Sequence, residues 1–293
     1  SYLSKRVARI YPGFIVAFAI CAFVVAPLGG AIPNLDVRSL SRLMIDCLLL
    51  QPPAIATAFP GSPYPMLNGS LWTIAYEFRC YLLVIALGFL GILRRGHWLL
   101  GLTVVCLILT CVVPVPDAVA WHPTPVASDA YFYSLNDLRI TAVGSPRQEF
   151  RLLAAFLAGA TFYAYRSTIK FTNPLLMVAA VGFVASLFVA SVAIAGTIVF
   201  GAYLIFAVAE KSGSGILSRV NNENDVSYGL YLYAWPVTKL LHWYVPSLSL
   251  PVMIVATWLI ALALGWASWL IVEKPVMQWM RSRKTGVPAR VAL

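Results

Sequence analysis

Charge is scarce in this sequence. Only 11% of its 293 residues are Asp, Glu, Lys or Arg, and 60% are hydrophobic, whereas a soluble domain carries roughly a quarter charged residues. So much apolar surface exceeds what one or two soluble cores could bury at this chain length. It also excludes intrinsic disorder, which requires low hydrophobicity. The sequence therefore predicts an integral membrane protein, with the lipid bilayer as a partner of its apolar surface.

Cysteine, histidine and metal-binding patterns are also sparse. Five cysteines, most of them in apolar runs, form an odd number that excludes a disulfide scaffold. None of the three histidines, His97, His122 and His242, lies centrally in an apolar run. We find no metal-ligand spacing, phosphate-binding glycine loop or internal repeat, and we expect no bound metal. The net charge of +10 indicates membrane topology rather than a nucleic-acid partner.

Long apolar runs dominate what is present. A helix needs roughly 17–25 mostly apolar residues to cross a bilayer. We predict an all-α integral membrane protein, a polytopic bundle of eight spans in a single domain over residues 1–293. A tight turn at Ala195-Gly196 would join the fifth and sixth spans. The predicted spans are about 11–28, 71–93, 98–115, 150–165, 174–193, 195–209, 226–245 and 250–272.

Positive charge predicts the orientation of these spans. With a cytoplasmic N-terminus, fourteen of the 21 Lys and Arg residues fall inside, five outside and two within spans. Cytoplasmic loops carry the excess of Lys and Arg, so the inverted topology is disfavoured. Both ends are therefore predicted to be cytoplasmic, including a tail at about 281–293. Two long stretches, 29–70 and 116–150, would lie outside the membrane.

A basic cluster precedes the first span. On a helix, Arg9 is an i,i+4 neighbour of Lys5 and an i,i+3 neighbour of Arg6, so the three side chains gather at the inner membrane face. Arginine binds phosphate in bidentate fashion, which makes the cluster a candidate clamp for an anionic cytosolic ligand. The alternative is that these residues are ordinary topology anchors.

Two charged residues enter the second span. A charge in hydrocarbon costs about 2.5–3.5 kcal/mol on insertion scales, so Glu77 and Arg79 are functional candidates. They cannot easily pair with each other, because helix residues two apart do not face each other. The alternative is that each is a structural partner of another polar group. Thr73, Glu77 and Tyr81 share one helical face, and Trp72, Tyr76 and Arg79 share the neighbouring one.

A polar and aromatic stripe marks the seventh span. Its members follow one another by three or four residues, although Pro236 interrupts the helix. Such a stripe is expected to face the bundle interior or a water-filled cavity. The alternatives are an interfacial aromatic belt and, for Lys239, a pairing with Glu77 at a similar depth. The stripe consists of Tyr228, Tyr231, Trp235, Lys239 and His242.

One further carboxylate, Glu273, closes the eighth span at the inner face. Its position suits a functional role. It also suits a helix-end ion pair with Lys274 or Lys211, which are both predicted to be cytoplasmic.

Four segments, in this order, resemble the membrane acyltransferase-3 family of bacterial O-acyltransferases, which decorate surface polysaccharides and related carbohydrates. In that family a KRxxRIxP motif precedes a span, a Ser-Leu-Trp segment is followed by a Glu and an aromatic residue, and Ser-Tyr-Gly-x-Tyr-Leu and Glu-x-Pro segments come later. The family has two further spans before the basic motif, and the first of them carries its catalytic His. We therefore expect an N-terminally incomplete chain that is inactive alone. The matching segments are residues 5–12, 70–78, 227–232 and 273–275.

The resemblance implies an enzyme of the bacterial inner membrane. It would transfer an acetyl or short acyl group from cytosolic acyl-CoA, with acetyl-CoA the first expectation, to a hydroxyl of a cell-envelope or exported carbohydrate. The alternatives are a transporter of a small anion or lipid-linked sugar, and an inactive family member. The expected roles are donor binding for Lys5, Arg6 and Arg9, catalysis for Glu77, and acceptor binding for Asn68, Trp72, Tyr76, Tyr228 and Tyr231.

Overall fold

The computed structural model describes residues 2–32, 36–55, 57–62, 66–113, 146–211 and 225–285. Within these residues, every regular element is a helix. Contacts divide the described chain into two compact units, and the single domain over residues 1–293 stays a prediction. Unit 1 holds residues 2–78 and 225–285, and unit 2 holds residues 79–113 and 146–211.

All eight apolar runs that were predicted as spans are helical, which confirms the helical fold class. The number of spans and the cytoplasmic position of both ends stay predictions. Two apolar helices, Gly96–Val112 and Asn173–Leu187, are shorter than a full span. Among the described residues, four helices are long and apolar enough to cross a membrane, namely Tyr2–Leu28, Trp72–Phe89, Ala193–Lys211 and Leu250–Met280.

Unit 1 gathers helices from both ends of the chain, and two of its long helices include a π-helical turn. The elements are α1 (Tyr2–Ile20), the π-helical η1 (Cys21–Val25), α2 (Ala26–Leu28), α3 (Val37–Leu48), the first turns of α4 (Trp72–Phe89), α12 (Ser227–Tyr244), α13 (Leu250–Ser268), the π-helical η6 (Trp269–Glu273) and α14 (Lys274–Thr285).

Prolines and a capping side chain set the local form of these helices. Pro251 lies in the first turn of α13, where its missing N–H costs no helical hydrogen bond. The Asp36 side chain accepts a hydrogen bond from the Ser39 N–H at 2.9 Å and so caps α3. Pro12 and Pro236 lie inside α1 and α12, and both helices continue through them, as packed membrane helices can.

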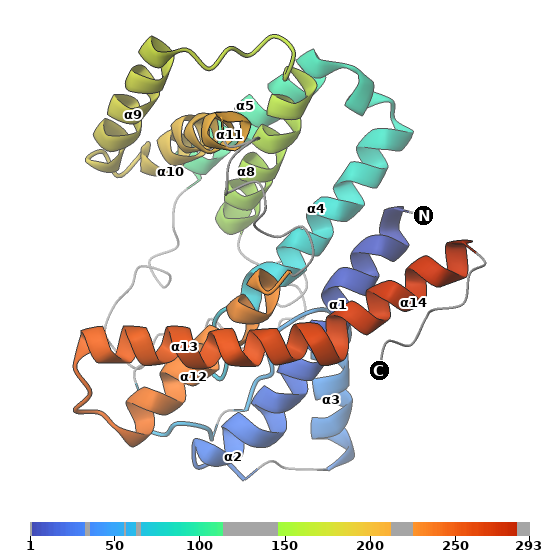
Figure 1. Cartoon of the computed structure of the whole chain (residues 1–293), viewed down its shortest axis with the longest axis vertical. Coiled ribbons are helices and arrows are strands. Elements are labelled where there is room, and N and C mark those ends of the chain that lie inside the picture. The colour runs from blue at the N-terminus through green and yellow to red at the C-terminus, as the bar shows by residue number, and fades with distance from the viewer. Residues whose placement is uncertain are drawn as a thin grey trace. The chain divides into compact units, whose positions relative to one another are not determined.

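The backbones of α12 and α13 approach each other closely. A Cβ atom added at Gly229 would lie 2.6 Å from the Gly265 Cα atom, so backbone meets backbone at this point. Small residues at membrane helix contacts permit this approach. α1 contacts α12, η6 and α14, and Figure 1 shows α13 running on into α14 beside α1.

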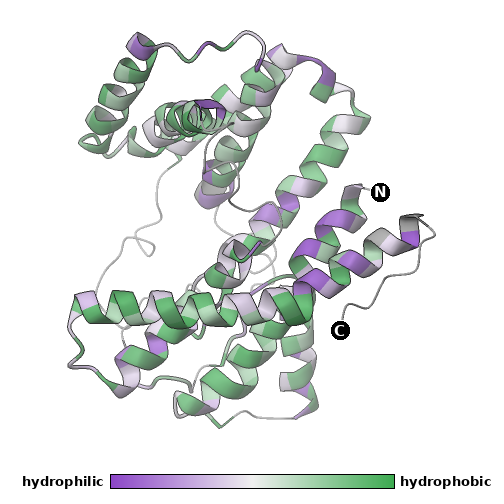
Figure 2. Cartoon of the chain, viewed as in Figure 1, coloured by the Kyte–Doolittle hydropathy of each residue, from purple (hydrophilic) through white to green (hydrophobic). Residues whose placement is uncertain are grey.

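Hydropathy changes along the helices of unit 1. Figure 2 shows hydrophilic residues gathered in the first turns of α1 and in α14, whereas α13 is hydrophobic along most of its length. Because α1 contacts α14, the polar parts of these two helices lie together.

α3 has exposed apolar side chains and one buried carboxylate. Met44 and Leu48 are exposed, whereas Asp46 is only 5% exposed. The Tyr11 hydroxyl donates a hydrogen bond to the Leu48 carbonyl at 3.0 Å. This hydrogen bond joins α3 to the N-terminal end of the predicted first span, and the position of the stretch 29–70 relative to the membrane stays a prediction.

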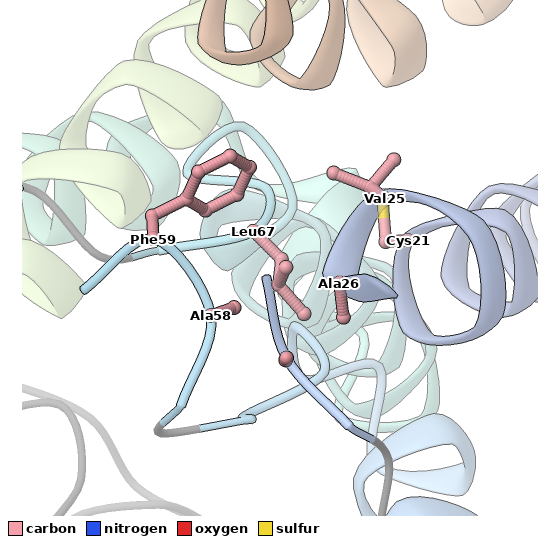
Figure 3. Close-up of a cluster of buried hydrophobic side chains, with 7 residues drawn as sticks. Cys21, Val25, Ala26, Ala58, Phe59 and Leu67 are labelled. Atoms are coloured by element: carbon pink, nitrogen blue, oxygen red, sulfur yellow. The ribbon is translucent and has the colours of Figure 1, made fainter. Parts of the chain in front are cut away.

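A buried apolar cluster fixes the segment after α3. Phe59 and Ala58 are fully buried against side chains of η1 and α2, as Figure 3 shows. Leu240 and Trp243 of α12 pack against the same cluster, and the Phe59 and Trp243 rings meet edge to face at 5.4 Å. The segment that was predicted as an outer loop is therefore part of the packed body of unit 1.

Unit 2 is packed mainly through apolar side chains. Thr103 and Thr161 share a hydrogen bond of 2.9 Å between α5 and α8, and Leu99 and Leu157 belong to one buried cluster. Besides the rest of α4, the elements are η2 (Ile92–Arg94), α5 (Gly96–Val112), α8 (Pro146–Ala164), α9 (Asn173–Leu187), α10 (Ala193–Gly196), the π-helical η4 (Thr197–Gly201) and α11 (Ala202–Lys211).

The turn predicted at Ala195-Gly196 is wrong. Both residues are helical, and the chain turns between α9 and α10 at residues 188–192. A Cβ atom at Gly196 would lie 2.2 Å from the Ser186 Cβ atom. The glycine therefore permits close helix packing here and does not end a helix.

Candidate active site

One face of α12 contacts residues of the described segments 59–62 and 66–73. The stripe predicted on this face therefore contacts protein, as expected of an interior face, although Tyr231 keeps 38% of its surface exposed. Tyr228 reaches α1 instead, where its hydroxyl donates to the Ile10 carbonyl at 2.9 Å. The other contacts are Tyr231 with Ser70 and Thr73, Trp235 with Met66, and Lys239 with Ser62.

Three hydroxyl or carboxylate groups meet where α4 begins. The hydroxyls of Thr73 and Tyr231 are 2.5 Å apart, and the Tyr231 hydroxyl also donates to the Ser70 carbonyl. The Glu77 carboxylate, one turn further along α4, lies close enough for its charge to act on the Tyr231 phenol. Glu77 itself is exposed on the surface of the protein, and its catalytic role stays a prediction.

The other predicted acceptor-binding residues differ in accessibility. Asn68 is fully buried; its amide donates to the Leu232 carbonyl at 2.8 Å, and its oxygen accepts from the Ser70 N–H at 3.0 Å. Asn68 therefore holds the entry to α4 against α12. The rings of Trp72 and Tyr76 meet edge to face at 5.6 Å, and Tyr76 is buried.

The basic cluster has an acidic partner that the sequence did not predict. An Arg9 guanidinium nitrogen lies 2.5 Å from a carboxylate oxygen of Asp225, directly before α12. The Ser227 hydroxyl donates to the same carboxylate at 2.7 Å. Lys5 is exposed, and the Arg6 guanidinium lies 5.1 Å from the centre of the Tyr2 ring. Arg9 is therefore a link between α1 and α12 as well as a candidate phosphate ligand.

Glu273 is buried beside this pair. It is only 4% exposed, and it accepts a hydrogen bond from the Ser268 hydroxyl at 2.9 Å. A Cβ atom at Gly13 would lie 3.2 Å from Glu273 Oε1, so α1 passes directly over the carboxylate. The π-helical turn η6 places Ser268 and Glu273, five residues apart, on the same side of the helix. A sequence analysis that assumes α-helical spacing does not predict this contact.

Within the described part of unit 1, Glu273 bonds to Ser268 and makes no ion pair with Lys274; its pairing with Lys211 stays a prediction. Lys211 belongs to unit 2, where its ammonium lies 3.5 Å from the Asn173 side-chain oxygen. Ser268, the observed partner, carries no charge and gives no signal in a search for ion pairs.

Arg79 has a partner within unit 2. One of its guanidinium nitrogens lies 3.0 Å from a carboxylate oxygen of Glu149, in the first turn of α8. This is the structural alternative that the sequence left open for Arg79. The pair joins α4 to α8 within unit 2.

Lys239 binds Ser62 rather than meeting Glu77 at a shared depth. Its ammonium lies 2.5 Å from the Ser62 hydroxyl and 5.0 Å from the centre of the Phe59 ring. Glu77 lies near Tyr231, two turns of α12 away, or about 12 Å along the helix axis. The predicted pairing of Lys239 with Glu77 does not fit these positions.

The histidines do not build a site in the described residues. His97 and His242 are exposed, and His122 lies outside the described residues. No group of three His, Cys, Asp or Glu side chains is clustered for a metal ion within the part of the chain that the structure describes.

Residues 1–272 match the family model of the acyltransferase-3 domain, which is described as an acyltransferase domain. The chain therefore belongs to the acyltransferase-3 family, and it is an acyltransferase of membrane type. The comparisons with curated proteins and with solved structures gave no match.

Proposed function

We propose that this membrane acyltransferase moves an acetyl or short acyl group from cytosolic acyl-CoA to a hydroxyl of a cell-envelope or exported carbohydrate. Its location would be the cytoplasmic membrane of a bacterium. The observation that carries the reaction class is the family match over residues 1–272. The donor and the acceptor follow from the resemblance, and the positions of the charged groups in unit 1 support them.

The donor site is proposed at the start of α1. Lys5, Arg6 and Arg9 offer three cations within two helical turns, which suits the phosphates of CoA. Arg9 is engaged by Asp225 at 2.5 Å, and its side chain keeps 51% of its surface exposed. A phosphate group of the donor would compete with the Asp225 carboxylate for the same guanidinium.

The acceptor site is proposed at the start of α4. Glu77 is exposed, and a carboxylate there can accept the proton of a sugar hydroxyl or orient that hydroxyl for attack on the acyl carbon. The paired hydroxyls of Thr73 and Tyr231 supply further hydrogen-bonding groups beside it. The rings of Trp72 and Tyr76 offer apolar surface for a sugar ring.

The direct test uses membranes that contain the whole gene product and acetyl-CoA labelled in the acetyl group. We expect label to appear in an alkali-labile ester of the carbohydrate fraction, and only in membranes that carry the gene. Label that stays with CoA, together with uptake of sugar or anion by the same cells, would replace the proposal with the transporter alternative. Neither activity would favour an inactive family member.

A further inference from the structure

We propose that one end of unit 2 binds the phosphate headgroup of an anionic phospholipid. Five exposed cations from three parts of the chain lie at this end. None of them belongs to the candidate active site, so this proposal does not depend on the proposed function. The five cations are Arg94, Arg95, Arg166, Lys170 and Lys211.

Contacts between helices bring these cations together. A Cβ atom added at Gly96 would lie 3.1 Å from the Tyr165 ring, so the start of α5, directly after Arg95, meets the end of α8. The Lys211 ammonium lies 3.5 Å from the Asn173 side-chain oxygen, so the end of α11 meets the start of α9. Residues 165–172 connect these two meeting points. The cations therefore gather at one end of the unit.

Negative charge is scarce at this end. Among the residues of unit 2 that the structure describes, the only acidic side chains are Glu149 and Glu210. Glu149 lies in the first turn of α8, at the other end of that helix, and pairs with Arg79. Glu210 is exposed next to Lys211, so one carboxylate stands against five cations. Cations gathered in this way repel one another, and an anion bound among them would stabilise the unit.

The position of Arg95 adds to this repulsion. Arg95 is the N-cap of α5, and no side chain caps the helix. Ser, Thr, Asp and Asn are the usual residues at this position, because the positive end of the helix dipole repels a cation. Arg95 therefore lowers the stability of the unit when no anion is bound, so helix capping does not account for this side chain.

Aromatic and apolar side chains border the cations, which favours a lipid over a soluble anion. Trp98 and Tyr163 are exposed, and the Arg166 guanidinium lies 4.2 Å from the centre of the Tyr163 ring. Further along α5, Leu100 and Val104 are exposed as well. Cations, then amphipathic rings, then apolar side chains are the order typical of a membrane interface. A phospholipid meets all three, because its phosphate binds the cations and its acyl chains cover the apolar side chains.

The alternative is that these cations act only as topology anchors. All five were predicted to be cytoplasmic, and an anchor needs nothing more than positive charge on that side of the membrane. A headgroup site also needs cations from different helices that converge on one place, as the contacts of Gly96 and Lys211 make them do. Basic pockets between membrane helices on the cytoplasmic side bind anionic headgroups in this way.

The experiment measures how a phospholipid stabilises the protein. The whole gene product is purified in an uncharged detergent, and its unfolding midpoint is followed while phosphatidylglycerol is added. We expect the midpoint to rise and then saturate, and phosphatidylcholine with the same acyl chains to have little effect. Arg95→Gln and Arg166→Gln should each raise the half-saturating concentration of phosphatidylglycerol about fivefold, the effect of one cation near an anionic headgroup. Glu210→Gln should lower that concentration.

Arg283→Gln is the matched control in unit 1. The Arg283 guanidinium lies 4.0 Å from the centre of the Trp279 ring, which is the arrangement of Arg166 over Tyr163. Arg283 is also exposed and was predicted to be cytoplasmic. Its substitution therefore removes the same charge from the same predicted side of the membrane. The response to phosphatidylglycerol should stay that of the wild type.

Three results would overturn the headgroup site. An equal loss of response in Arg166→Gln and Arg283→Gln would mean that any surface cation contributes. Stabilisation by glycerol phosphate at the same concentration as phosphatidylglycerol would identify a soluble anion as the ligand. Equal stabilisation by phosphatidylcholine would mean that lipid covers the apolar surface without using the cations. If Arg95→Gln does not fold, Arg166→Gln and Glu210→Gln decide, because their opposite effects do not depend on the N-cap of α5.

Discussion

The contacts inside unit 1 differ in chemistry from the contacts inside unit 2. In unit 1 the buried apolar cluster is supplemented by polar contacts between elements, among them Arg9 with Asp225, Tyr231 with Thr73, and Tyr228 with the Ile10 carbonyl. In unit 2 the contacts are mostly apolar, and the Arg79–Glu149 ion pair links α4 to α8.

The segments that resemble the family follow the same division. All four of them, residues 5–12, 70–78, 227–232 and 273–275, belong to unit 1. Polar groups are costly in a membrane protein unless they are paired, so we expect the chemistry in unit 1, where these segments gather. Substitution of a candidate site residue in unit 1 should change the reaction, whereas breaking the Arg79–Glu149 pair of unit 2 should change the amount of folded protein.

The sharpest test compares Glu77 with Arg79, which are two residues apart in one helix but belong to different units. Glu77→Gln keeps the size and removes the basic group, so transfer should fall about 100-fold or more, in the range that general bases contribute, with membrane abundance preserved. Arg79→Gln should lower abundance, because it leaves Glu149 without its partner, and should keep the activity per folded molecule. Both quantities are measured by labelled transfer and by immunoblot. Full activity in Glu77→Gln would exclude it as a base.

The next largest effect concerns the contact between α12 and α13. In Gly229→Ala the new methyl group would meet the Gly265 backbone at 2.6 Å, so the helices must separate, at a cost of about 3 kcal/mol or more. Gly101→Ala is the matched control in unit 2, since nothing lies within 4 Å of its added Cβ atom. Thermal unfolding in detergent should show a lowered midpoint for the first variant and not for the second. Equal midpoints would mean that this contact is not tight in solution.

Asp46 gives unit 1 a pH dependence with a defined sign. Burial raises the pKa of its carboxyl to about 6, and the Arg42 charge opposes part of this shift. The folded chain therefore binds more protons than the unfolded chain between about pH 4 and pH 6, so stability falls as pH rises through that window.

Asp46→Asn removes this penalty, so its gain in unfolding midpoint over wild type should be larger at pH 7.5 than at pH 4.5. Asp36→Asn is the control of opposite sign. The hydrogen bonds from Ser39 lower the pKa of Asp36, so the stability that it provides is lost as pH falls. If the rise in unfolding midpoint for Asp46→Asn does not depend on pH, the Asp46 carboxyl is accessible to water and its pKa is not raised.

The smallest expected effect separates two roles of Arg9. If Arg9 binds CoA phosphate, Arg9→Ala removes a charge-assisted hydrogen bond of about 1.5–3 kcal/mol, and the KM for acyl-CoA should rise about 10- to 100-fold. Asp225→Asn then frees the guanidinium and should lower that KM. If Arg9 only links the helices, both variants should reduce folded protein alike and leave KM unchanged.

The helices and the α12 stripe were predictable because they depend on local pattern. Apolar length marks a helix that can enter a membrane, and steps of three and four residues place Tyr231, Trp235 and Lys239 on one face. Because polar groups are costly in lipid, this face could be predicted to point toward protein.

The partners of these residues were not predictable from one sequence. Asp225 meets Arg9 across 216 residues of chain, and Ser62 meets Lys239 across 177; no local pattern carries such contacts. α3 shows a different limit. An amphipathic pattern gives two faces, but in a membrane protein it does not say which of them faces the protein, and here the apolar face is exposed.

The division of unit 1 between the two ends of the chain also bears on how the protein is made. Residue 78 leaves the ribosome 147 residues before residue 225. At the usual 5–20 residues per second, that interval is on the order of ten seconds. During it α1, α3 and the segment 59–73 are already synthesised, but α12, their polar counterpart, is not. Unit 2 can assemble in that time. The first half of unit 1 lacks its α12 hydrogen-bond partners until they are synthesised. We therefore expect a chaperone of nascent membrane helices to bind this half of unit 1.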